Sequence, residues 1–148
     1  MHTLVNGLIA GAAGTGALNI ASYLDMALRG RGASGTPEES VQKLADVAHV
    51  DLGEGERADH RKQALGALLG YATGMGVAVC FAPLAARKPP WPVGALALGA
   101  LAMVGSNAPM TVLGITDPRT WSASGWISDM VPHLAYGIVG YTAFRHLS

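Results

Sequence analysis

The charged residues of this chain are crowded into one short segment, and this distribution constrains the fold more than any other feature. Fourteen of the twenty Asp, Glu, Lys and Arg residues lie between Asp25 and Lys62. Long uncharged stretches fill most of the rest, at 4–24, 63–86, 89–116 and, more briefly, 130–144. A helix rises about 1.5 Å per residue, so about 20 apolar residues cross the roughly 30 Å hydrocarbon core of a bilayer. The pattern predicts an all-α integral membrane protein with four transmembrane helices.

The 148 residues fit one domain, a four-helix transmembrane bundle. The expected spans are about 4–28, 61–84, 91–115 and 126–145, with a hydrophilic loop at 29–60. The fourth span has to tolerate Asp129 near one end. Trp91, Trp121 and Trp126 fall at predicted span edges, where indole rings prefer to lie. A soluble Ala-rich bundle is the alternative, but residues 64–86 offer no polar stripe, which a soluble helix needs.

The hydrophilic loop 29–60 is predicted to contain a short amphipathic helix of its own. Thr36 is suited to the N-cap, and Glu39 three residues later completes a capping box. An apolar stripe then follows at helical spacing, formed by Val41, Leu44, Ala45 and Ala48. This helix is expected to end near His49 and to lie on the bilayer surface or cover the end of the bundle. The acidic segment 51–59 lacks the spacing of an EF-hand and is expected to be a solvated linker.

Small residues recur at helical spacing in three of the predicted spans. They are Gly7 and Gly11 in the first span, Gly66, Gly70 and Gly74 in the second, and Gly137 and Gly140 in the fourth. Helices in lipid associate through close backbone contact and interhelical hydrogen bonds, so these faces predict packing seams. The second span has more glycine than one seam requires, which also favours self-association.

The polar residues inside the spans are predicted to gather at one depth. Asp25, Asn107 and His133 each lie one or two turns from a span end, and alternating topology brings those ends to the side of the long loop. A lone carboxylate in hydrocarbon is costly, so we predict a polar cluster of these three residues, with Ser22 and Tyr136 nearby. Three interpretations stay open: a structural link between helices, a small proton-accessible or binding site, or snorkelling of Asp25 and His133 to the interface.

Several classes of function lack support in the sequence. The formal net charge is zero, so no basic surface argues for a nucleic acid partner. The single cysteine, Cys80, gives neither an intramolecular disulfide nor a metal site, and one His with one Asp is too few ligands for a metal. Only His133 lies inside a span, whereas a b-type haem usually needs two facing histidines. No hydrolase or kinase motif is present. We therefore expect no catalytic residues, no metal and no cofactor.

Short motifs in both halves of the chain carry a family resemblance. They are Gly7-Leu8-Ile9-Ala10-Gly11, Ala108-Pro109 followed by Gly114-Ile115, and His133-Leu134-Ala135-Tyr136-Gly137. With these motifs the chain resembles small bacterial inner-membrane proteins of unknown function, the YagU-like group among them. The resemblance implies four helices, a location in the bacterial inner membrane and no known activity.

The distribution of basic residues predicts the orientation. Seven Lys and Arg residues belong to the side of the long loop, and three, Arg87, Lys88 and Arg145, belong to the side of the termini. The long loop is therefore expected in the cytoplasm and both termini outside it.

The preferred function is that of a non-catalytic accessory or assembly component of a membrane complex. Its partners would be the lipid bilayer and either further copies of the chain or other membrane subunits. The alternative is a small transporter or channel component with a proton-accessible site around Asp25 and His133. Small multidrug transporters have a similar size, but they carry a glutamate in the middle of the first helix, where this chain has Asn19. A membrane enzyme is the third possibility.

Overall fold

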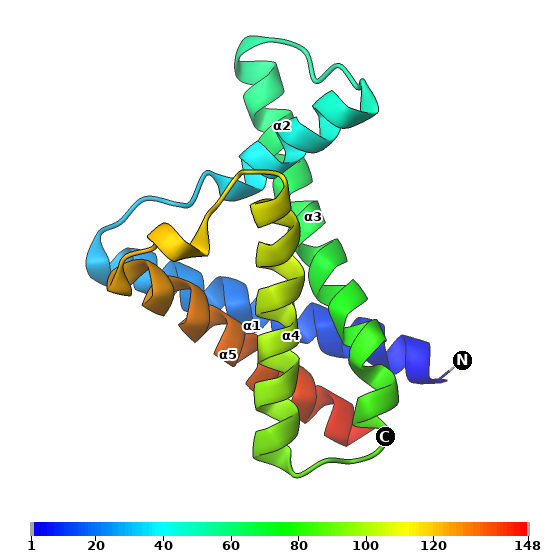
Figure 1. Cartoon of the computed structure of the whole chain (residues 1–148). Coiled ribbons are helices and arrows are strands. Elements are labelled where there is room, and N and C mark those ends of the chain that lie inside the picture. The colour runs from blue at the N-terminus through cyan, green and yellow to red at the C-terminus, as the bar shows by residue number, and fades with distance from the viewer. Residues whose placement is uncertain (1, 148) are drawn as a thin grey trace.

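In the computed structural model, which describes residues 2–147, every regular element of that range is helical. The elements are α1 (His2–Arg29), α2 (Thr36–Ala48), α3 (Gly55–Ala85), α4 (Trp91–Val112), a 3-10 turn η1 (Pro118–Thr120) and α5 (Ala123–Leu147), as Figure 1 shows. The all-α prediction is confirmed. Three helices, α1, α3 and α4, are long and apolar enough to cross a membrane. Within the described residues α5 is not one of them, so the fourth span stays a prediction.

Two helix ends differ from the sequence prediction, each for a local reason. The helix predicted to end near 115 stops at Val112, because Gly114 adopts a left-handed conformation with φ of 70°. The N–H of Ile115 then donates to the carbonyl of Met110 at 2.9 Å, a bond that closes a Schellman cap. At the other boundary α3 begins at Gly55, so only the first part of the acidic segment 51–59 is a linker.

The predicted capping box at the start of α2 is wrong. Gly35 occupies the N-cap position and offers no side chain, and the N–H of Glu39 donates to its carbonyl at 3.0 Å. Thr36 is already helical, and its hydroxyl pairs with that of Ser34 at 2.6 Å. The Thr36 hydroxyl therefore bonds to Ser34, which precedes the helix, and does not cap the first turn of α2.

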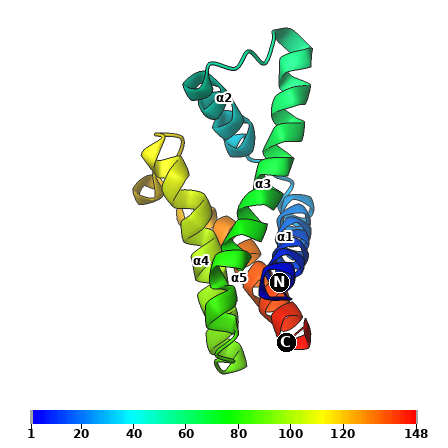
Figure 2. The same cartoon turned by 90° about the vertical axis from the view of Figure 1, so that its right-hand side faces the viewer.

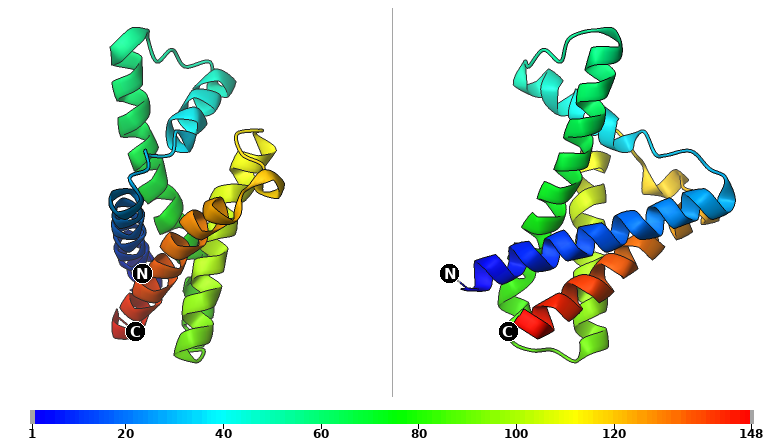
Figure 3. Two further views of the ribbon diagram at one scale, coloured as in Figure 1. Left: turned by 90° about the vertical axis from the view of Figure 1, so that its left-hand side faces the viewer. Right: turned by 180° about the vertical axis from the view of Figure 1, so that it is seen from behind.

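The four long helices form two antiparallel pairs that cross obliquely. α1 and α5 lie side by side along most of their length, and α3 and α4 form a hairpin that crosses them (Figures 1 and 3). α3 packs on α1, and α4 packs on α5. The two termini lie close together, and Asn6 Nδ2 donates to the carbonyl of Leu147 at 3.0 Å. The sequence predicted a four-helix bundle without its crossing angles, and the structure arranges the four long helices as two crossed pairs.

The amphipathic helix α2 packs against the N-terminal half of α3 (Figure 2). Val41 and Ala45 from its apolar stripe are buried with Leu52, and Leu69 of α3 packs against them. Pro37 lies over Gly66, where an added Cβ would come within 3.0 Å of the proline ring. Leu44 of the same stripe stays 44% exposed, so α3 covers only part of the stripe.

The 3-10 turn η1 is held by Asp117, which lies in the loop between α4 and α5. Its carboxylate accepts the backbone N–H of Arg119 at 3.0 Å and pairs with the guanidinium of the same residue at 2.8 Å. Hydrogen bonds from the Arg119 side chain and backbone, together with its charge, hold the pKa of Asp117 below its usual value. Beside this turn the rings of Trp121 and Trp126 meet edge to face, with centroids 5.1 Å apart.

Glycines lie where the crossed helices approach most closely. An added Cβ on Gly11 of α1 would lie 2.5 Å from Met75 Cα on α3, and one on Gly7 would lie 2.9 Å from Val79 Cα. Gly137 and Gly99 oppose each other across the α4–α5 contact in the same way, while Gly140 lies against Leu98 and the carbonyl of Ala10. Backbone therefore lies directly on backbone at these points, as close packing of helices in lipid requires.

The three glycines of α3 do not share one seam, which differs from the prediction. Gly66 faces α2, and Gly74 faces Thr15 of α1 and the ring of Tyr136. Gly70 lies between them in sequence but points into open space, with no atom within 4 Å of an added Cβ. A helix turns by about 100° per residue, so residues 66, 70 and 74 point in successively different directions around α3, and different helices lie against Gly66 and Gly74.

We expect Gly137→Ala to destabilise the protein and Gly70→Ala to be tolerated. The methyl group of the first variant would press on the Ala95 carbonyl and on the Gly99 backbone, and overpacking of this kind costs about 1–3 kcal/mol. The second variant adds a methyl group in open space and improves helix propensity by up to about 1 kcal/mol. Unfolding of both variants in the same detergent measures the difference. Equal loss of stability in the two would contradict the contact assignment.

Candidate functional site

Four polar side chains meet between α4 and α5 and form what we call the α4–α5 polar cluster: Ser106, Asn107, Asp129 and His133. Ser106 Oγ lies 3.1 Å from Nε2 of His133. Asn107 Nδ2 donates to Oδ2 of Asp129 at 2.8 Å. His133 Nδ1 lies 2.7 Å from the backbone carbonyl oxygen of Asp129 and 3.5 Å from its Oδ1. Two interhelical hydrogen bonds therefore join α4 to α5 at one level.

These contacts define the protonation pattern of a neutral His133. Both neighbours of Nδ1 are oxygens that only accept hydrogen bonds when the Asp129 carboxyl is ionised, so Nδ1 carries the proton. Nε2 is then an acceptor, and the hydroxyl of Ser106 is the donor that faces it. That hydroxyl also lies 3.1 Å from the Met103 carbonyl oxygen, so it has two acceptors to choose between. If His133 were protonated, Nε2 would become a donor, and the Ser106 hydroxyl would donate to the Met103 carbonyl oxygen instead.

A second group, the α1–α5 ion-pair cluster, lies where α1 ends and α5 begins: Asp25, Arg29, Arg31, Ser124 and Ser128. The Asp25 carboxylate pairs with Nε of Arg29 and Nε of Arg31, each at 2.6 Å. Arg29 also donates to the hydroxyls of Ser124, at 2.7 Å, and Ser128. Ser128 Oγ lies 3.4 Å from Asp25 Oδ2. This cluster ties the end of α1 to the first turns of α5.

The predicted cluster of Asp25, Asn107 and His133 is thus divided into two groups in the structure. Asn107 and His133 come together through Asp129, but Asp25 is neutralised by its own arginines and forms no direct hydrogen bond with His133. The two groups adjoin only through the neighbouring residues Ser128 and Asp129 of α5.

Tyr136 and Ser22 also differ from their predicted places beside the cluster. Tyr136 is 1% exposed, and its hydroxyl donates to the carbonyl of Gly74 on α3 at 2.5 Å. It belongs to the packing centre of α1, α3 and α5. Ser22 is half-buried on α1, and no hydrogen bond of its side chain occurs among the described residues.

Sequence reasoning missed the partners rather than the polar residues. Arg29 lies four residues after Asp25, the spacing at which helix side chains pair, and this signal was available. Asp129 was treated as a charge to be tolerated, although its spacing of four from His133 puts both on one face of α5. Ser106 is not among the residues of the predicted cluster. Its contact with His133 depends on the register of α4 against α5, which no local pattern reveals.

The side chains of the α4–α5 polar cluster form a chain of hydrogen-bonding groups. A carboxylate, an imidazole and a hydroxyl lie in sequence along it, on Asp129, His133 and Ser106. Metal binding has no comparable support, because no group of three or more His, Cys, Asp or Glu side chains within residues 2–147 could hold an ion.

Comparisons with protein-family models, curated proteins and solved structures find no match to this chain. The resemblance to YagU-like inner-membrane proteins therefore stays a prediction from the motifs.

We expect a double-mutant cycle of Asn107→Ala and Asp129→Ala to give a coupling energy of about 0.5–2 kcal/mol in detergent, because each variant removes the same interhelical hydrogen bond. The matched cycle of Asp25→Ala and His133→Ala should be additive, since these side chains share no bond. An equal coupling energy in the two cycles would instead support the single cluster predicted from the sequence.

Proposed function

We propose that the chain is a small integral membrane protein that acts as a non-catalytic accessory or assembly component of a membrane complex. The single observation that carries the proposal is the apolar exterior of all four long helices. Ile20 on α1 is 62% exposed, Leu68 on α3 64%, Val104 on α4 61% and Ile127 on α5 57%. A soluble monomer rarely exposes so many large apolar side chains, whereas lipid or other membrane subunits would cover them.

The open arrangement of the helices supports an assembly role. α4 touches α5 and α3, α3 touches α1 and α2, and much of each helix stays uncovered. A chain of this kind gains further packing when it meets other membrane helices, since association in lipid depends on close contact rather than on hydrophobic burial. We place it in the bacterial inner membrane on the basis of its motifs, with α5 as the fourth span.

Membrane extraction tests the embedding directly. The expressed chain should stay in the membrane fraction after an alkaline carbonate wash and should need detergent for release, because its apolar helix faces lie in the hydrocarbon. Release by carbonate alone would contradict the proposal. The size of the detergent-purified particle then shows whether further subunits are present, and a monomer with no partner would argue against the assembly role.

The orientation gives a second test. Seven basic residues lie on the side of the long loop, so Ser34 is expected in the cytoplasm and His146 outside it. In a background with Cys80→Ser, an impermeant thiol reagent applied to intact cells should label His146→Cys and spare Ser34→Cys. The reverse labelling pattern would invert the assignment.

The alternative function is a proton-linked transporter or channel component, favoured by the α4–α5 polar cluster. Here Asp129 and His133 would exchange protons along the Ser106–His133–Asp129 chain, with Asp25 stabilising the start of α5. Asp129→Asn preserves the shape and the hydrogen-bonding capacity of the side chain but cannot titrate.

Proton flux decides between the two functions. In proteoliposomes with an internal pH dye, the transporter reading expects flux through the wild-type chain and at least a tenfold loss, about 1.4 kcal/mol in activation free energy, in Asp129→Asn. The accessory reading expects no flux above the lipid background from either protein. Asn107→Ala serves as a control that disturbs the same cluster but removes no titratable group.

A further inference from the structure

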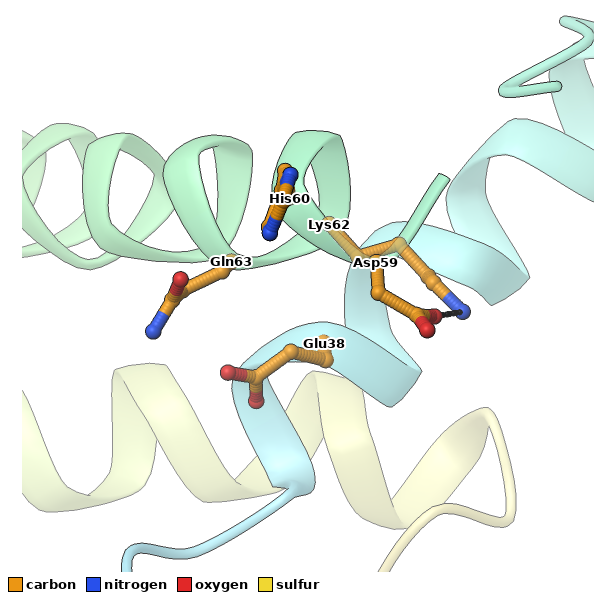
Figure 4. Close-up of a pocket in the computed structure, with 5 residues that line it drawn as sticks. All are labelled: Glu38, Asp59, His60, Lys62 and Gln63. Atoms are coloured by element: carbon orange, nitrogen blue, oxygen red, sulfur yellow. Dashed lines mark ion pairs between the residues drawn. The ribbon is translucent and has the colours of Figure 1, made fainter. Parts of the chain in front are cut away.

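A shallow pocket lies outside both clusters, between the first turn of α2 and the beginning of α3 (Figure 4). It encloses about 340 Å³ and is lined by Glu38, Asp59, His60, Lys62 and Gln63. Figure 4 shows Glu38 on α2 facing the segment of α3 that carries Asp59, His60, Lys62 and Gln63. The position is at the expected start of the second span, where the hydrocarbon gives way to the headgroup layer.

Glu38 carries the unusual feature of this pocket. Its Oε2 is closed off from solvent yet accepts no hydrogen bond, and it is the one side-chain atom in that condition among the described residues. A buried acceptor without a partner costs free energy, more so when it is charged. Such an atom calls for a donor that the chain itself does not supply.

The charges in the pocket favour a cation as that donor. Lys62 is occupied by Asp59, with Nζ 2.8 Å from Oδ1, so these two charges cancel. Glu38 is then the acidic group of the pocket without an ion pair among the described residues, and His60 and Gln63 add groups that can accept hydrogen bonds. A metal ion is disfavoured because the His, Asp and Glu side chains here do not converge as a group of three ligands.

We propose that this pocket binds a primary ammonium group. Its three N–H donors can pair with the carboxylate of Glu38 on α2 and with the amide oxygen of Gln63 and a ring nitrogen of His60 on α3, all of which line the pocket. Two sources carry this group at a membrane surface, an aminophospholipid headgroup and a free alkylamine. Ammonium binding goes beyond the proposed accessory function and does not depend on it.

The surface of α3 below the pocket suits the lipid source. Ala67 and Gly70 follow Gln63 at spacings of four and seven residues, so they share its face of the helix. Both are exposed, and Gly70 has open space above it. A smooth strip of small residues therefore leads from the pocket toward the middle of the span, where an acyl chain attached to the headgroup would lie.

Thermal unfolding of the full chain in detergent tests the proposal. Ethanolamine at about ten times its Kd should raise Tm by about 3–6 °C, whereas choline, which has no N–H donor, should not. Glu38→Gln should weaken ethanolamine binding about tenfold or more, because it removes a charge-assisted hydrogen bond. Glu39→Gln is the matched control, since Glu39 is exposed beside it and should leave the shift intact.

Nanodiscs distinguish the two sources of the ammonium group. If the headgroup is the ligand, phosphatidylethanolamine discs should raise the Tm of the wild-type chain above its value in phosphatidylcholine discs, and Glu38→Gln should remove that difference. If only free ethanolamine stabilises the chain, the ligand is a soluble amine. Absence of both effects, an equal effect of choline, or equal losses in the Glu38 and Glu39 variants would overturn the proposal.

Lys62 offers one competing explanation, because it could leave Asp59 and satisfy Glu38 within the chain. Glu38→Gln and Lys62→Gln should be additive in stability if an external ammonium is the partner. A strong coupling between them without any amine present would assign Glu38 to Lys62 and would also overturn the proposal.

Discussion

The packing of the Tyr136 ring into the space left by two glycines is the contact on which the crossing of these helices depends. An added Cβ on Gly14 of α1 would lie 2.8 Å from the ring, and one on Gly74 of α3 would lie 3.3 Å from it. The hydroxyl ends on the Gly74 carbonyl at 2.5 Å. One side chain of α5 therefore fixes how close α1 and α3 can come, and a larger residue at either glycine would separate all three helices.

This contact explains which glycines lie at a helix crossing and why G-x-x-x-G spacing alone did not identify them. G-x-x-x-G patterns show that a helix face is smooth, but not whether another helix lies on it. Gly74 lies at the crossing point and Gly70, one turn away, faces outward, because crossed helices meet over a short length rather than along a whole seam. The existence of helices, their class and most of their ends followed from the sequence. The crossing angle did not, since it is set by the particular shapes that meet at Tyr136, Gly137 and Leu98.

The polar residues show the same division between local and tertiary information. Asp25 was predicted to pair with His133 on the basis of a common depth, whereas its carboxylate pairs with Arg29 and Arg31 in the structure. A partner four residues away on the same helix is available whatever the tertiary fold, so it should have been considered first. The pairing of Ser106 with His133 has no such local signal, because it joins residues 27 apart on different helices.

The two clusters differ in how the charge of their carboxylate is balanced, although both involve α5. The α1–α5 ion-pair cluster holds its charges where arginine side chains can reach water, so it can stay ionised and anchor the first turns of α5. At the next residue of α5, the α4–α5 polar cluster holds the carboxylate of Asp129, with the imidazole of His133 and the amide of Asn107 as its neighbours. A purely structural link would be served by neutral hydrogen-bonding groups, which cost less to bury. The pairing of Asp129 with His133 between α4 and α5 is therefore what keeps a proton-linked role as the alternative proposal to assembly alone.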